Sequence, residues 1–257
     1  MTRITDDTYS TGWIPDTYDD RDWDFQQAFG TSNQLPLSHD LTEYVSTFLF
    51  QGSWPSCVGH AIATQIMIEE RIAGLRGSIP SRAYIYAMAR AQYQDELLKT
   101  GTYPRLAYNA VKRWGCPPEP WWPYNTRDGS LYRKPNYNAK RQASSRIGLK
   151  YYRITDDISD NVRQAIADNH PVTIGTEVIE HMHNYTYGEV LYPPPPGQAT
   201  LGGHFMLITG YERDKFTVVN SWRGTPLFRM SEEMLEWEES SDFYVITGWS
   251  CLNETQS

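Results

Sequence analysis

The stretch from residue 51 to residue 60, Gln-Gly-Ser-Trp-Pro-Ser-Cys-Val-Gly-His, joins a polar loop to an apolar helical pattern. After Cys57, the apolar residues Val58, Ile62 and Ile66 follow in steps of about four residues, which predicts a helix that begins near Cys57. The positive end of a helix dipole lowers the pKa of a thiol at its N-terminus and favours thiolate. A lone cysteine at the start of a helix more often packs as a small apolar side chain than acts as a nucleophile. Its interpretation therefore depends on the rest of the chain.

Two further motifs lie far downstream. Gly202-Gly203-His204 opens an apolar stretch, and Asn220-Ser221-Trp222 ends the next one, sixteen residues after the histidine. Two strands joined by a short turn would bring Asn220 beside His204, where its amide oxygen can accept the ring N–H and fix the tautomer. Amide hydrolysis needs a nucleophile, a proton acceptor and donors for the oxyanion, and these motifs contain the first two.

In this order, Gln51 with Cys57, the Gly-Gly-His204 motif and Asn220-Ser-Trp222 resemble the signature of papain-like cysteine peptidases. His204 follows Cys57 by 147 residues, and Asn220 lies slightly beyond the usual interval. The resemblance extends from about residue 37 to residue 249. It implies an α+β fold of the papain-like type, in which a mainly helical lobe and an antiparallel, β-barrel-like lobe enclose the active-site cleft.

The resemblance also implies roles for the residues that match. Cys57 is expected to be the nucleophile, and His204 its ion-pair partner and the later proton donor to the leaving amine. Asn220 is expected to orient the imidazole ring. The Gln51 side-chain amide and the Cys57 backbone N–H are expected to bind the oxyanion.

Substrate contacts are implied in the same way. Gly101 and Thr102 match the place where the family's backbone pairs with an extended substrate. Phe205 is expected to line the main specificity pocket and to narrow it, and Trp222 to border the leaving-group side. The resemblance implies neither a metal nor an organic cofactor.

Cysteine usage departs from the usual family pattern. The three cysteines are an odd number, which suits a reducing compartment. Trp54 stands where the family usually has a disulfide-bonded cysteine, so that bridge is expected to be absent, as in many bacterial and viral relatives. No long helical pro-segment precedes the catalytic region, and activation of the usual zymogen type is therefore not expected.

The chain divides into three parts by composition. Residues 1–36 are an acidic lead-in with little expected regular structure, residues 37–150 a mainly helical lobe, and residues 151–257 a β-rich lobe. The apolar spacing predicts helices after Cys57 and over residues 81–98, 104–114 and 159–167, and strands over 171–178, 203–211, 216–222 and 242–249.

A basic segment raises the question of a nucleic-acid partner. Residues 131–153 carry seven lysines and arginines and no acid, interleaved with tyrosines. Such a pattern can bind nucleic acid, but the net charge of −8 favours a solvated loop. We expect the aspartates of the lead-in to lie against this basic surface and to obstruct the cleft; they are Asp16, Asp19, Asp20, Asp22 and Asp24.

Composition places further limits on function. The 257 residues contain no apolar run of the roughly 20 residues that span a bilayer. The first 25 residues hold seven aspartates, unlike a signal or transit peptide. The sequence thus predicts a cytoplasmic protein without a membrane partner. His181 and His183 make a weak metal pair and are expected to be surface residues.

We therefore expect a peptidase that hydrolyses peptide or isopeptide bonds through a thioester acyl-enzyme, with a peptide or protein as substrate. The same machinery would also serve an amidase or transferase acting on a non-protein amide, such as a cell-wall peptide. A catalytically silent peptide-binding module is a third interpretation, against which the presence of all four catalytic residue types argues.

Overall fold

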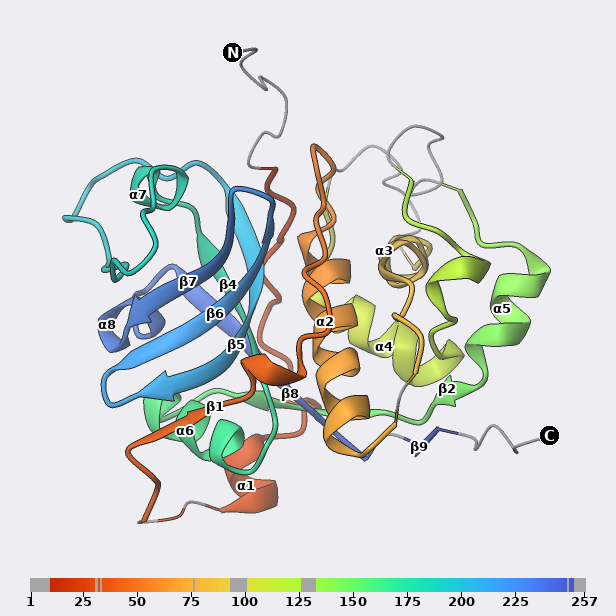
Figure 1. Ribbon diagram of the computed structural model, residues 1–257, viewed down its shortest axis with the longest axis horizontal. Coiled ribbons are helices and arrows are strands. Elements are labelled where there is room, and N and C mark those ends of the chain that lie inside the picture. Colours follow the sequence, from red (N-terminus) through yellow and green to blue (C-terminus); the bar gives the residue numbers. More distant parts are fainter. Residues whose placement is uncertain are drawn as a thin grey trace.

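The computed structural model describes residues 10–30, 32, 34–75, 77–92, 101–125, 133–248 and 250–251. Helices and an antiparallel sheet lie side by side (Figure 1). The helices are α1 (Phe25–Phe29), α2 (Cys57–Ile72), α3 (Arg82–Arg90), α4 (Pro104–Trp114), α5 (Tyr137–Ala143), α6 (Ile158–Ala167), α7 (Glu180–His183) and α8 (Glu232–Leu235), and Thr42–Tyr44 and Glu119–Trp121 form 3-10 turns.

The main sheet has the strand order β3-β8-β4-β5-β6-β7, with β1 paired to β5. All of its strand pairs are antiparallel. The strands are β1 (Ser38–Asp40), β3 (Lys150–Ile154), β4 (Val172–Glu177), β5 (Gly203–Glu212), β6 (Lys215–Trp222), β7 (Thr225–Ser231) and β8 (Ser240–Thr247); β2 (Arg146–Ile147) pairs with β9 (Ser250–Cys251) in a second sheet.

Helix α2 lies between α3 and α4 on one side and the sheet on the other, and it contacts both α3 and β5 (Figure 1). Thirteen of its sixteen residues are buried, because a helix in this position has little solvent-facing surface. Gly59 lets α3 come close, since a Cβ at this position would lie 2.6 Å from the backbone oxygen of Arg82. The first residue of α2 is therefore held at the boundary between the two layers.

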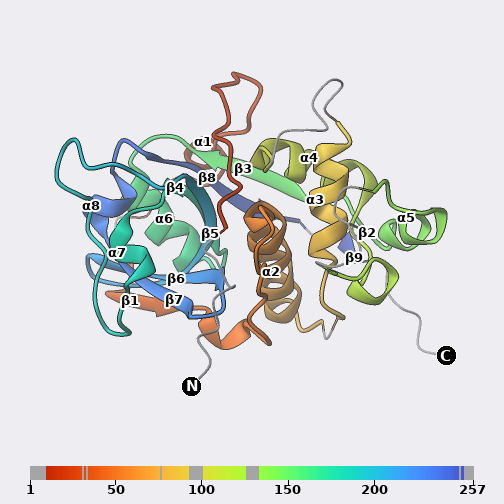
Figure 2. The same cartoon turned by 90° about the horizontal axis from the view of Figure 1, so that it is seen from above.

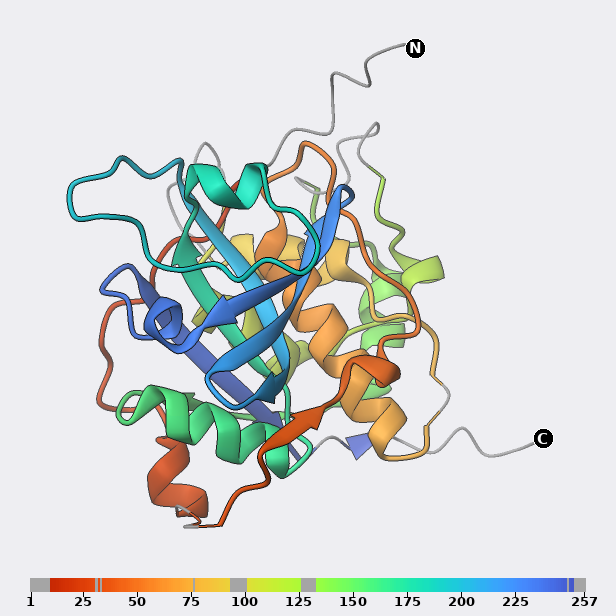
Figure 3. The same cartoon turned by 60° about the vertical axis from the view of Figure 1, so that its left-hand side comes forward.

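Two large apolar cores stabilise these layers. One core is formed by side chains of the sheet, such as Val172, Met206 and Phe228, together with apolar side chains of α6 and α1, which lie beneath the sheet in Figure 3. The other surrounds α2 and joins Cys57 to Phe205 of β5. Burial of apolar side chains, at roughly 25 cal/mol per Å², holds the start of α2 against β5.

The architecture confirms the α+β prediction, while some elements differ from the expected pattern. Strands β3 and β7 were not predicted, and the lead-in contains the short helix α1. The predicted helix over 81–98 ends at Arg90, and residues 93–98 lie outside the described residues. The division into lobes at residues 37 and 150 stays a prediction. In the part of the chain that the structure describes, no helix has the length and apolarity needed to cross a membrane.

Candidate active site

Cys57 is the first residue of α2 and is completely buried. Burial raises the pKa of its thiol to about 12, because the charged thiolate loses its hydration. Hydrogen bonds from backbone N–H groups, including those of Phe205 and Gly12, lower this pKa only in part. Burial thus outweighs the effect expected from the helix N-terminus, and in this conformation Cys57 is a neutral thiol.

His204, the second residue of β5, is buried beside Asn220 of β6. The distance between His204 Nε2 and Asn220 Oδ1 is 2.7 Å. Asn220 Nδ2 donates to the backbone oxygen of Thr225 at 2.8 Å, so the amide oxygen is turned towards the imidazole. His204 Nε2 must then carry the proton, and Nδ1 is the free acceptor of the neutral ring.

The surroundings of His204 keep its ring neutral. Burial lowers the pKa of His204 to about 4, and the hydrogen bond to Asn220 opposes this effect. The indole of Trp222 stacks on the imidazole, with ring centres 4.3 Å apart and planes at 17°. Nδ1 is buried and has no hydrogen-bond partner among the residues that the structure describes. A buried acceptor without a partner is costly and is typical of a functional group.

Gln51 is held by several contacts at the end of the loop before α2. Its Nε2 donates to the backbone oxygen of Trp54 at 2.7 Å and to that of Ser10 at 2.9 Å. Its Oε1 accepts a hydrogen bond from the hydroxyl of Ser221 at 2.5 Å. Ser221 thus fixes which end of the Gln51 amide donates, a role that the sequence interpretation missed although Ser221 directly follows Asn220.

A segment of the lead-in, residues 10–14, lies in the same place. Figures 1 and 2 show this part of the chain, in red, running between the sheet and α2. The backbone N–H groups of Gly12 and Trp13 donate to Gly203 O at 2.9 and 3.1 Å. Thr102 N donates to Gly12 O at 2.9 Å, and Ile14 N donates to Thr102 O at 3.2 Å. The residue expected to pair with substrate therefore pairs with this segment.

Trp13 anchors the segment in a slot of the sheet and is only 6% exposed. Its Nε1 donates to Asp242 Oδ2 at 2.8 Å. A Cβ on Gly175 would lie 2.1 Å from the indole, and one on Gly203 would lie 2.6 Å from it. Two glycines thus make room for the ring, and Phe205, which is 1% exposed, belongs to the same apolar core.

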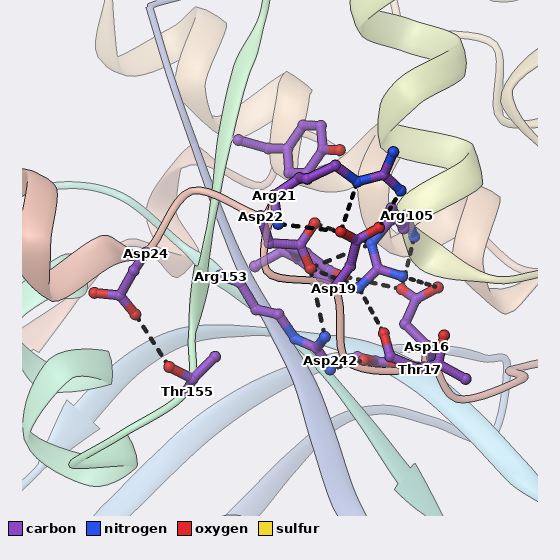
Figure 4. A network of polar contacts seen from close by, with 12 residues as sticks. Asp16, Thr17, Asp19, Arg21, Asp22, Asp24, Arg105, Arg153, Thr155 and Asp242 are labelled. Carbon is purple, nitrogen blue, oxygen red and sulfur yellow. Dashed lines mark hydrogen bonds and ion pairs between the residues drawn. The ribbon is translucent and has the colours of Figure 1, made fainter.

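The aspartates of the lead-in contact a smaller basic surface than the sequence suggested. Of residues 131–153, Arg153 binds Asp22 and Asp242, at 3.5 and 2.7 Å. The other cation is Arg105 of α4, which lies outside the predicted basic segment and binds Asp22 at 2.5 Å (Figure 4).

Two lead-in aspartates and one basic residue have other partners. Asp24 accepts from the Thr155 hydroxyl, and Asp19 pairs with Arg21. Arg146 pairs with Glu70 instead.

The two histidines of the weak metal pair lie on a short helix. His181 and His183 belong to α7, and His181 Nε2 lies 3.2 Å from the carboxylate of Glu189. Within the described ranges, no group of three or more His, Cys, Asp or Glu could hold a metal ion. Cys57 and Cys116 are free thiols, and the side chain of Cys251 lies outside the described part.

Comparisons with known proteins identify a family and a shared fold. The model of the family described as papain family cysteine protease matches residues 56–226. No curated protein matches the sequence.

Several solved structures share the fold. Xylellain, a cysteine protease from Xylella fastidiosa, is 24% identical with a TM-score of 0.82, over 96% of this chain and 99% of that one. Procathepsin B S9 from Trypanosoma congolense is 15% identical with a TM-score of 0.68, over 94% and 86% of the two chains. The Carica candamarcensis cysteine protease CMS1MS2, solved in complex with E-64, is 20% identical with a TM-score of 0.62, over 83% and 99%.

Proposed function

This chain belongs to the papain family of cysteine proteases, and we propose that it hydrolyses peptide or isopeptide bonds through a thioester formed on Cys57. The observation that carries the proposal is the pairing of His204 Nε2 with Asn220 Oδ1. This pairing leaves Nδ1 as the proton acceptor, and the next residue, Phe205, packs in the same apolar core as Cys57. The alternatives, transfer to a non-protein amide and silent binding, become outcomes of the tests below.

Each proposed step uses one feature of this geometry. His204 Nδ1 takes the proton of Cys57 as the sulfur attacks the substrate carbonyl carbon. Gln51 Nε2 and the Cys57 backbone N–H stabilise the oxyanion of the tetrahedral intermediate. The imidazolium then gives its proton to the leaving amine as the C–N bond breaks, which leaves a thioester. Water, deprotonated by His204, cleaves the thioester and restores the thiol.

Asn220 and Ser221 are proposed as positioning residues. Asn220 holds the ring in the Nε2-protonated tautomer, so that Nδ1 can act as the base. Ser221 holds the Gln51 amide with its NH₂ end towards the cleft. Both effects follow from one short stretch at the end of β6, which explains why these residues occur together.

We further propose that residues 10–14 cover the cleft and keep the enzyme latent. The support is that Ser10 O accepts from the proposed oxyanion donor, Gln51 Nε2, at 2.9 Å. Trp222 Nε1 donates to the same oxygen at 3.3 Å. A donor that is occupied by the chain's own carbonyl cannot stabilise a substrate oxyanion.

The direction of the docked segment favours inhibition over cleavage. The resemblance places Thr102 on the side of the acyl half of a substrate and Trp222 on the side of the leaving group. In a substrate, the acyl half precedes the cleaved bond. In the docked segment the order is the reverse, because Ser10 contacts Trp222 and the later residue Trp13 bridges to Thr102. The segment therefore fills the cleft without offering a correctly oriented bond.

The decisive test compares the full chain with Cys57→Ala under reducing conditions. In a chain whose cover is opened by Trp13→Ala, we expect cleavage of a peptide library while Cys57 is present and no turnover after Cys57→Ala, with an unchanged melting temperature. Cys116→Ala is the matched control, because Cys116 is also a buried free thiol but lies outside the proposed site. Asn220→Ala should be slow but active, since it loses only the orientation of the ring. A Cys57→Ala variant that still turns over would overturn the proposal.

Two further readouts separate the alternatives. Labelling of Cys57 by an epoxide thiol reagent is expected, and its failure in a chain with an open cleft would support a silent binding module. Formation of a stable acyl product with an added amine, in place of the free acid, would support a transferase.

A further inference from the structure

Three carboxyls and two guanidinium groups meet where residues 10–24, from here on called the N-terminal segment, lie against the rest of the molecule. Asp16 and Asp22 belong to the segment, Arg105 to α4, Arg153 to β3 and Asp242 to β8 (Figure 4). Their side chains are 14% exposed or less, and that of Asp242 is fully buried. This network links the segment to both layers of the molecule.

The two cations are already occupied by two of the carboxyls. Arg105 donates through Nε and Nη2 to Asp22, at 3.0 and 2.5 Å. Arg153 Nη2 donates to Asp242 Oδ1 at 2.7 Å. Asp16 is left with a single distant ionic contact, 3.9 Å from Arg105 Nη1. If all three acids were ionised, the network would carry one uncompensated negative charge.

Asp16 also lies directly against Asp242. The backbone N–H of Asp16 donates to Asp242 Oδ2 at 2.8 Å, and Trp13 Nε1 donates to the same oxygen. Asp16 Oδ2 accepts from Arg105 N at 2.8 Å and from the Tyr244 hydroxyl at 2.9 Å. Two carboxyls in one desolvated site cannot both ionise cheaply.

Among the described residues, the other titratable groups around the network form no ion pair with these three carboxyls. Lys112 of α4 places its Nζ over the rings of Trp23 and Tyr151 instead. The tyrosines that face the network are neutral at physiological pH, since burial raises the pKa of each; they are Tyr108 of α4, Tyr151 of β3 and Tyr244 of β8. Asp19, next to them in the segment, is balanced by Arg21. The network therefore contains three carboxyls and two guanidinium groups, and its net charge is −1 when all of them are ionised.

We propose that Asp16 and Asp242 form a proton-dependent latch, in which the pair shares one proton while the segment is docked and a rise from about pH 5 to pH 7 loosens the segment. This inference rests on the proposal that residues 10–14 cover the cleft, and it adds that pH regulates this cover. It implies that acid closes the cleft and that neutral pH favours the open enzyme.

The sign follows from the pKa in the two states. Burial, and then the charge of Asp242, raise the pKa of Asp16 to about 7 in the docked state; the pKa of Asp242 is also raised, mainly by burial. In the released segment Asp16 is in water, with an ordinary pKa of about 3.9. Docking thus takes up a proton, so its stabilisation is complete below about pH 4 and is lost as the pH rises through about 7.

Hydrogen exchange in the full chain tests the latch without the need for activity. In a Cys57→Ala background, the protection factors of the Gly12, Trp13 and Ile14 amides, corrected for the intrinsic exchange rate, report the docked fraction. For one shared proton we expect them to fall up to about tenfold per pH unit between pH 5 and 7. Protection that is constant or rises over this range would overturn the latch and leave the cover intact, whereas no protection at any pH would overturn both.

Asp16→Asn provides the matched variant. It leaves two carboxylates for two guanidinium groups, so we expect protection at pH 7 to increase and the pH slope to disappear. Asp19→Asn, on the exposed pair with Arg21, should keep the wild-type slope. An Asp16→Asn variant with the wild-type slope would show that another group carries the proton, and the proposal would be wrong.

Discussion

The N-terminal segment docks in two ways, and its two halves differ in what holds them. Residues 10–14 lie between the sheet and α2 through backbone pairing and one buried indole, contacts that depend on shape. Residues 16–24 lie on α4 and β3 through carboxyl and guanidinium groups, contacts that depend on charge. The difference teaches that one half determines where the segment binds, while the other makes its binding sensitive to solution conditions.

The largest expected effect is on the shape-dependent half. Trp13→Ala removes a buried indole and should weaken docking by about 3 kcal/mol or more. The rate of Cys57 alkylation should then rise by roughly 10²-fold or more, measured by mass spectrometry with an epoxide reagent. Trp23→Ala, at a residue that is 47% exposed, is the control and should change this rate little. Equal effects of both variants would remove the distinction between the two halves.

Gln51 lies where the segment meets the proposed catalytic machinery. In a Trp13→Ala background, where the cover is open, Gln51→Ala should lower kcat by roughly 10²-fold through loss of an oxyanion donor. KM should change far less, because the donor acts mainly in the transition state. Steady-state kinetics on a fluorogenic peptide measure both constants. A change in KM alone would assign Gln51 to binding of the ground state.

The pKa of Cys57 should depend on whether residues 10–14 cover the site. Burial raises the pKa of Cys57 to about 12 and lowers that of His204 to about 4, so both shifts favour the neutral pair in the closed state. Opening by Trp13→Ala admits water, which lowers the thiol pKa and raises that of the imidazole. The pH profile of iodoacetamide alkylation should move to lower pH by at least about one unit, a tenfold gain in thiolate. Superimposable profiles of the two proteins would contradict this.

The smallest expected effect is on the charge-dependent half. Asp22→Asn removes the anion that binds Arg105 and should increase Cys57 labelling by roughly three- to tenfold. High salt should bring the wild type closer to the variant, because it screens partly exposed pairs. Labelling at low and high ionic strength measures both effects. A salt response of the variant equal to that of the wild type would show that Asp22 does not contribute through charge.

Local patterns were enough to predict much of the fold. The apolar spacing after Cys57 predicted α2, and the segments 104–114, 203–211 and 216–222 match α4, β5 and β6 closely. These elements have strong periodicity and clear ends. Strand β7 was missed, because Pro226 and Arg229 interrupt its alternation, and the regular pairing with β6 decides its structure. Propensity is a weak guide where pairing supplies the energy.

In the candidate site, too, some residues could be predicted from the sequence and others only from the tertiary structure. The proposed catalytic group was predicted from the sequence, because its motifs resemble in type and order those of papain-like cysteine peptidases. It did not predict Arg105, Asp242 or the slot between Gly175 and Gly203, because these residues come together only when α4, β3, β4, β5 and β8 pack.

The order of residues along the chain thus predicted the nucleophile candidate and the histidine–asparagine pair, through motifs that resemble those of a known family, and the α+β class, through local periodicity. The tertiary structure alone decided that residues 10–14 lie between the sheet and α2, that burial favours the neutral forms of Cys57 and His204, and that three acids share two bases. Desolvation and the charge balance of a site are set by what surrounds each group in space, and neighbours in space are far apart in this sequence.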